Sequence, residues 1–113
     1  MQSQTNKVWH KVYSLSYQDS INTNYGFESD DHAKCKKRSC KVTDYSKAKG
    51  SYTSRIDDYL GNGYYWLRSP HQGYTDHAWI VDYDGMNYPG YEIDNPSSSV
   101  RPCIAIDINW FYS

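Results

Sequence analysis

The sequence carries almost no net charge and no long apolar run, and each absence excludes a class of protein. Its 12 Lys/Arg and 13 Asp/Glu give a formal net charge of −1, unlike the strongly basic surface of a simple nucleic-acid-binding domain. No transmembrane run, signal peptide or lipidation motif occurs in the chain. We therefore expect no nucleic-acid partner and no membrane insertion, while the oligomeric state stays open.

The sequence is also poor in residues spaced to bind a metal. Its three cysteines, Cys35, Cys40 and Cys103, form no CxxC pair, and no histidine lies at zinc-ligand spacing. We expect neither a metal nor another cofactor. Cys35 and Cys40 can close a short disulfide if the protein is secreted, whereas Cys103, which precedes apolar residues, is predicted to be a buried thiol.

Aliphatic residues are scarce, but aromatic residues are abundant. They make up 17% of 113 residues and include 13 tyrosines. A chain of this length suits one domain, residues 1–113, with a thin core. Aromatic rings must therefore supply much of the buried area, at roughly 25 cal/mol per Å² of apolar surface.

Charge is distributed unevenly along the chain. Residues 1–50 contain nine Lys/Arg and five Asp/Glu, whereas residues 51–113 contain three and eight. The densest basic run is Lys34-Cys35-Lys36-Lys37-Arg38. Because it has no interleaved aromatics or glycines, we interpret this run as a solvated loop rather than a phosphate-binding patch.

Local signals in the first half predict one strand and two short helices. The pattern from Lys7 to Leu15 shows imperfect alternation and predicts a strand. Ser16 is a cap-like serine before a short helical turn. The segment Thr43–Gly50 has a threonine at its start, lysines near its end and a glycine beyond, which predicts a second short helix.

The second half predicts antiparallel β-structure. Tyr64–Ser69, Ala78–Tyr83 and Val100–Ile108 read as strands separated by loops rich in Gly, Asp, Asn, Pro and Ser. Asp84-Gly85 is a hairpin turn signal, because glycine adopts a positive φ at low cost. Together with the short helices, this pattern predicts an α+β domain.

The stretch YYWLRSP, residues 64–70, is interpreted as structural. We expect Trp66 and either Tyr65 or Leu67 to point inward. Arg68 and Arg101 are predicted to be buried or half-buried clamps, since the guanidinium fork bonds several carbonyls or a carboxylate. Pro70 is expected to end the strand.

Three motifs in this order carry a family resemblance: YWLRSP, AWIVDYDG and VRPCIAIDI. The chain from about Val8 onward is similar to the bacterial domain of unknown function 6273, whose members typically read WWLRSP and close with GVRPA. Serine at position 99 and cysteine at position 103 depart from that closing motif. The resemblance implies a C-type-lectin-like fold, related to formylglycine-generating enzymes and retroelement variable proteins. Since members usually carry another stretch before the first strand, we expect a shortened version.

The loops after Pro70 are candidates for ligand binding. They combine Tyr, Asp, Asn, His and Gly, a mixture typical of antibody paratopes, and the resemblance implies a ligand surface in the same region. The proposed contact residues are His71, Tyr74, Asp76, His77, Trp79, Tyr83, Tyr88 and Tyr91.

This surface predicts a non-enzymatic binding or display domain with a protein or glycan ligand. The residue mixture also matches targeted diversification of asparagine codons, as in the variable proteins of diversity-generating retroelements of bacteria and phages. A cell-surface, secreted or phage-particle location is therefore favoured. A neighbouring template repeat with a reverse transcriptase would support this hypothesis. A structural domain without a ligand is a further alternative.

Two other functions stay as alternatives. Calcium-dependent carbohydrate binding would use Asp82, Asp84 and Asn87, although the usual lectin tripeptide is replaced by Asp94-Asn95-Pro96. A formylglycine-generating-enzyme-like catalyst would need an active cysteine pair, and Cys35 with Cys40 lies outside the motifs. The four histidines are scattered and no nucleophile elbow is present, so we predict no catalytic residues.

Overall fold

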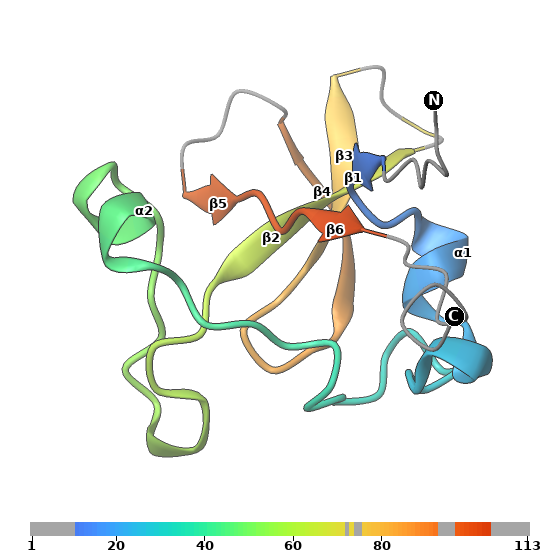
Figure 1. Cartoon of the computed structure of the whole chain (residues 1–113), viewed down its shortest axis with the longest axis horizontal. Helices are drawn as coiled ribbons and strands as arrows, with labels where there is room; N and C mark the ends of the chain where they lie inside the picture. The colour runs from blue at the N-terminus through green and yellow to red at the C-terminus, as the bar shows by residue number, and fades with distance from the viewer. Residues whose placement is uncertain (1–10, 72, 74–75, 93–96, 105–113) are drawn as a thin grey trace, which may run out of the picture.

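The computed structural model of the chain describes residues 11–71, 73, 76–92 and 97–104. Its short helices and strands are joined by long connections (Figure 1). In chain order the elements are β1 (Val12–Tyr13), α1 (Tyr17–Ser20), η1 (Thr23–Tyr25), α2 (Asp44–Ala48), η2 (Asp57–Tyr59), β2 (Tyr64–Pro70), β3 (His77–Val81), β4 (Asn87–Glu92), β5 (Ser98–Ser99) and β6 (Cys103–Ile104).

Four strands form the main sheet in the order β4-β3-β2-β5. β3 pairs antiparallel with both β2 and β4, whereas β5 runs parallel to β2. β1 and β6 form a separate antiparallel pair. The prediction of an α+β domain with mostly antiparallel strands and few short helices is therefore confirmed. No helix among the described residues is long and apolar enough to cross a membrane.

Both helix predictions are confirmed by their caps. Ser16 and Asp19 form a capping box at α1, in which each side chain accepts a backbone N–H of the other at 3.0 Å. The Thr43 side chain accepts the backbone N–H of Ser46 at α2. Gly50, just beyond α2, has φ +103°, a conformation that glycine adopts readily.

Strand boundaries agree with the sequence only in part. β2 ends at Pro70 and β3 closely follows its predicted range. Of the strand predicted from Lys7 to Leu15, only β1 is found, and residues 7–10 lie outside the described part. Of Val100–Ile108, β6 is found, and residues 105–108 lie outside the description.

The main core cluster lies on one face of the main sheet, and Ile80, 1% exposed, is buried on the other face. Leu15, Tyr65, Leu67 and Val81 are each at most 6% exposed and pack together. Trp66 was predicted to point inward, but it is only half-buried and belongs to the opposite face of β2, because successive side chains alternate along a strand. The inward positions are taken by both Tyr65 and Leu67. Burial raises the pKa of Tyr65 to about 12.

The interpretation of the basic run as a solvated loop is wrong for Arg38. Its side chain is 0% exposed, and all five N–H donors are used by main-chain carbonyls. A buried guanidinium needs these hydrogen bonds, because moving a charged group out of water without replacing its hydrogen bonds to water costs much free energy. The acceptors are the carbonyls of Gly85 at 2.5 Å, Ser20 at 2.8 Å, Glu28 at 3.0 Å, Asp30 at 3.2 Å and Ala33 at 2.9 Å.

Two other arginine predictions have different outcomes. Arg68 does bond the carbonyl of Ser14 and the carboxylate of Asp19, but its side chain is 58% exposed, so the predicted burial is wrong. Arg101 is half-buried and donates to Arg38 O at 3.1 Å and to the Tyr65 hydroxyl at 3.0 Å. The half-buried clamp predicted at position 101 is therefore present.

All three cysteines are free thiols. Cys35, which belongs to the basic run, is buried. Cys103 was predicted to be buried, but it is half-buried, as is Cys40, and both pack against the core.

Candidate functional site

A hollow of about 620 Å³ opens where β2 ends, beside α1. Its described lining contains three aromatic rings and uncharged polar groups. The lining residues are Tyr17, Gln18, Ser69, Pro70, His71, Gly73 and Trp79. We refer to it as the aromatic hollow.

Hydrogen bonds between α1 and β2 position this lining. The backbone N–H of Arg68 donates to Leu15 O at 2.8 Å, and that of Tyr17 donates to Ser69 Oγ at 2.8 Å. The irregular pairing of β2 with β3 between Trp66 and Pro70 lies at the same level. The regular pairing of β2 with β3 is therefore interrupted where α1 docks on the strand end.

Two aromatic side chains from distant parts of the chain meet in the hollow. The rings of Tyr17 and Trp79 lie 4.5 Å apart, centroid to centroid, at 45°. The ring of His71 lies 6.1 Å from that of Trp79. Tilted aromatic pairs at these separations attract one another beyond simple burial. The hollow therefore has a preformed aromatic wall.

The Tyr17 hydroxyl is held in place from behind. It donates to Asp31 Oδ2 at 2.5 Å, and this bond raises the pKa of Tyr17 to about 12. The same bond lowers the pKa of Asp31, which also contacts His32 Nδ1 at 2.6 Å. A carboxylate that accepts hydrogen bonds is stabilised in its charged form.

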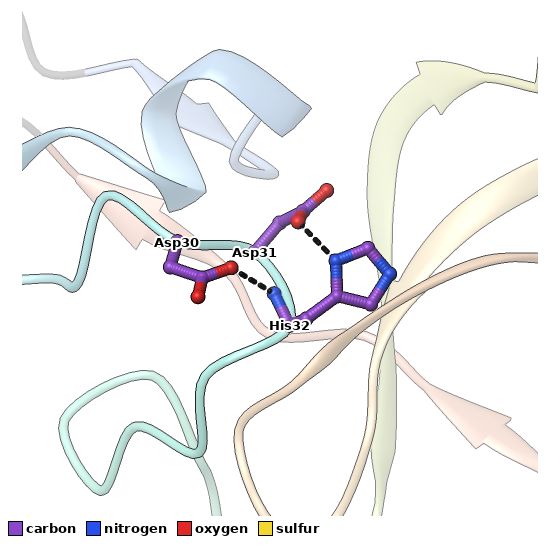
Figure 2. Close-up of side chains that lie close together, drawn as sticks. All are labelled: Asp30, Asp31 and His32. Carbon is purple, nitrogen blue, oxygen red and sulfur yellow. Dashed lines mark hydrogen bonds and ion pairs between the residues drawn. The ribbon is translucent and has the colours of Figure 1, made fainter.

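Asp30, Asp31 and His32 form a group whose ligand atoms lie within 4.8 Å of one another. Figure 2 shows the carboxylate of Asp31 directed at the His32 ring and that of Asp30 at the His32 backbone N–H, a bond of 2.9 Å. Because the Asp31 oxygens are engaged by Tyr17 and His32, the group acts as a hydrogen-bonded support for Tyr17.

Four of the predicted contact residues lie at this end of the sheet. His71 and Trp79 line the hollow. Asp76 and His77 lie on the connection between β2 and β3 and at the start of β3, where the Asp76 carboxylate accepts a bond from His77 Nδ1 at 2.8 Å. This bond lowers the pKa of Asp76. The backbone N–H of His71 also donates to His77 O at 3.0 Å, which joins the two strand ends.

The other four predicted residues are placed differently. Tyr83 lies beyond β3, where its ring contacts three further tyrosines. Tyr88 is exposed on β4 opposite Ile80. Tyr74 lies outside the described residues, and Tyr91 is described only through its β4 backbone, opposite Ala78.

The residues considered as calcium ligands make hydrogen bonds within the fold. Asp82 Oδ1 accepts the backbone N–H of Tyr83 at 2.6 Å, and Asp84 Oδ1 accepts that of Met86 at 3.1 Å. Asn87 is buried and donates to Ser20 Oγ at 2.6 Å. Burial raises the pKa of Asp82. Asp94-Asn95-Pro96 lies outside the described residues.

Sequence reasoning missed Tyr17 and Gln18 as lining residues. The capping signal at Ser16 predicted a helical turn there, but nothing local indicates that this turn meets the far end of β2. The turn reaches the site through long-range contacts, such as the hydrogen bond from Tyr17 N to Ser69, 52 residues away in the sequence, and that from Arg68 N to Leu15 O.

Fold and site define a small α+β domain with an uncharged aromatic hollow at the end of its longest strand. Residues 1–108 match the model of the family described as Domain of unknown function (DUF6273). The chain belongs to that family, as its YWLRSP and VRP motifs predicted. Neither a curated protein nor a solved structure matches the chain.

Proposed function

We propose that this chain is a ligand-binding domain that holds an uncharged, hydroxyl-rich ring, such as a sugar unit of a glycan, in the aromatic hollow. The observation that carries the proposal is the pair of Tyr17 and Trp79, 4.5 Å apart in the wall of the hollow. Ligand sites combine apolar and aromatic walls with a few polar groups that fix orientation.

The chemistry of the lining favours this ligand class. The described lining contains no Lys, Arg, Asp or Glu, so it offers no ion pair to a charged ligand. A sugar ring presents an apolar C–H face, which packs against aromatic rings, and hydroxyls, which hydrogen-bond to polar side chains at the edge. Gln18 supplies a polar group of that kind, and so does the Ser69 hydroxyl, which accepts from Tyr17 N and keeps its own hydrogen to donate.

The C-type-lectin-like fold is part of this proposal. It is supported by the family motifs, by the short antiparallel strands and by the long connections between them. We also propose that the chain is a display domain with diversified loops, as in retroelement variable proteins. A template repeat and a reverse-transcriptase gene beside the coding sequence would support it, and their absence would refute it.

A glycan array with matched variants tests the binding proposal. We expect the wild-type protein to bind a defined set of glycans, and Gln18→Ala combined with His71→Ala to weaken that binding at least about tenfold, because the variant loses the Gln18 amide and the His71 ring of the wall and a tenfold change corresponds to about 1.4 kcal/mol. Asn24→Ala, an exposed amide on η1, is the control and should bind as the wild type does. Equal binding by the hollow variant, or no glycan bound at all, would refute the proposal.

A further inference from the structure

Four tyrosine rings meet at the other end of β2, away from the aromatic hollow. Tyr52 and Tyr64 stack with centroids 4.8 Å apart and planes 7° from parallel. Tyr83 lies 6.3 Å from each of these rings and 5.7 Å from Tyr59. We call this group the tyrosine cluster. Its members come from four separate segments of the chain, and Tyr52 is 37% exposed.

The backbone around the tyrosine cluster is tightly fixed. Tyr52 N donates to Ser97 O at 3.0 Å, and Asn62 Nδ2 donates to Tyr83 O at 3.0 Å. Gly63 allows the close approach of the chain, because a Cβ there would lie 2.3 Å from Val42 and 2.5 Å from Tyr52 O. Rings held in this way lose little conformational entropy on binding a partner.

Lysines surround a second hollow beside the tyrosine cluster. This hollow, of about 620 Å³, is lined by Lys34, Lys36 and Lys41 together with Tyr59 and Asn62. The Lys34 ammonium lies 5.7 Å above the Tyr59 ring, and Lys41 Nζ donates to Leu60 O at 2.8 Å. The first contact holds the Lys34 ammonium over an aromatic ring and the second holds that of Lys41 in the same hollow, where both can attract an anionic group.

The lysines of this hollow outnumber its acidic groups, which are Asp58 and Asp84. Asp84 is 9% exposed and its carboxylate accepts the backbone N–H of Met86. Asp58 is exposed to solvent and also lines the hollow. Exposed aliphatic side chains, Ile56 at 48% and Leu60 at 57%, flank the η2 turn that carries Tyr59.

We propose that the tyrosine cluster and its lysines bind an acidic peptide segment of a protein partner. The carboxylates of the segment pair with Lys34 and Lys36, and its apolar side chains pack on the tyrosines and Leu60. Tyrosine-rich, preorganised surfaces with complementary charge at their edge are the usual anchors of protein interfaces.

A single-stranded nucleic acid fits the surface less well. Bases of single-stranded nucleic acids stack on exposed ring faces. Tyr52 and Tyr64 stack on each other, so the faces by which they touch are not accessible to a base. A phosphate backbone also places a charge on every nucleotide, whereas a peptide can place its acids opposite the lysines and uncharged residues near Asp58.

This surface is independent of the aromatic hollow. Tyr64 begins β2 and Pro70 ends it, and a strand of this length spans about 20 Å. Binding of an acidic peptide therefore does not depend on the proposed glycan binding, and either proposal can fail alone.

Peptide selection on the whole chain tests the proposal. A displayed library of random twelve-residue peptides is selected on the wild-type protein, and a recovered peptide is synthesised and measured by fluorescence anisotropy. We expect recovered peptides with an excess of Asp and Glu over Lys and Arg. Lys34→Glu with Lys36→Glu, and separately Tyr59→Ala, should each weaken the synthesised peptide at least tenfold.

The control variant makes the same change of charge, two lysines to glutamates, at positions away from the tyrosine cluster. Lys37 belongs to the same basic run but extends towards Gly26, and Lys11 lies beside β1. Lys11→Glu with Lys37→Glu should leave affinity within about twofold, and thermal melting should show all variants folded. The proposal would be overturned if the recovered peptides had no excess of acidic residues, or if the control variant lost as much affinity as the test variant. It would also be overturned if Tyr59→Ala left the affinity unchanged, or if a twelve-nucleotide oligothymidylate bound more tightly than the peptide.

Discussion

At the scale of the residue, the bond between Tyr17 and Asp31 links the aromatic hollow to the pH of the solution. Asp31 has a lowered pKa, caused first by the Tyr17 hydroxyl. A carboxyl group with a lowered pKa in the folded state stabilises the fold above its unfolded pKa of about 3.9 and loses this contribution as the pH falls through its folded value. Tyr17, with its pKa raised to about 12, is neutral at that pH.

We therefore predict that Tyr17→Phe destabilises the protein near neutral pH and loses its effect in acid. The difference in free energy of unfolding between wild type and variant should shrink as the pH falls from about 7 to about 3, as measured by urea unfolding. His32→Ala removes the other side-chain contact that lowers the pKa of Asp31, so its effect on stability should also be lost once Asp31 is protonated. A difference that stays constant or grows in acid would contradict the link.

At the scale of the element, the hairpin between β3 and β4 depends on one glycine. Gly85 has φ +86°, and a Cβ there would lie 2.0 Å from the backbone oxygen of Cys35. Gly50 has a similar φ of +103° but nothing within 4 Å. The two positions therefore separate conformational strain from steric overlap.

Gly50→Ala should cost about 1 kcal/mol of stability from its unfavourable φ alone. Gly85→Ala should cost about 3 kcal/mol or more, because backbone atoms cannot move aside as a flexible side chain can. Chemical unfolding of the two variants measures both values. Equal losses would show that the segment around Cys35 adapts easily to the turn.

The elements also show what could be predicted from the sequence. The turn at Gly85 and the caps at Ser16 and Thr43 depend on neighbouring residues, so local patterns were enough to predict them. The burial of Arg38 and the meeting of Tyr17 with Trp79 depend on contacts across most of the chain, which no local pattern encodes. For this reason the basic run was interpreted as a solvated loop although Arg38 is buried. For the same reason the contact residues were predicted to share one surface, whereas the structure places some of them at one end of β2 and some at the other.

At the scale of the whole molecule, Arg38 joins parts of the chain that would otherwise be held by few contacts. Its guanidinium bonds the end of α1 at Ser20, the segment 28–33 and the β3–β4 hairpin at Gly85. Its own carbonyl accepts from Tyr65 and Arg101. The buried Arg38 side chain thus connects segments that aliphatic side chains would connect in a larger core.

We predict that Arg38→Ala destabilises the fold by at least about 3 kcal/mol, because the two buried carbonyls of Ser20 and Gly85 lose their donor at about 1–3 kcal/mol each and three part-buried carbonyls lose theirs as well. Arg38→Lys keeps the charge but has only three donors and should cost about 2 kcal/mol. Arg68→Ala, at an exposed arginine, should cost less than about 1 kcal/mol. Urea unfolding gives all three values, and a loss at position 38 no larger than at position 68 would refute this role.

The cage of carbonyls around Arg38 also bears on how the chain folds. The carbonyls come from segments up to 47 residues from the arginine, so the cage is complete only when all of them have assembled. A partly folded chain would hold this charge with missing partners, which disfavours intermediates that have lost one segment. Unfolding should therefore be cooperative, and the amide hydrogens of α1 and the β3–β4 hairpin should exchange with solvent together rather than one after the other.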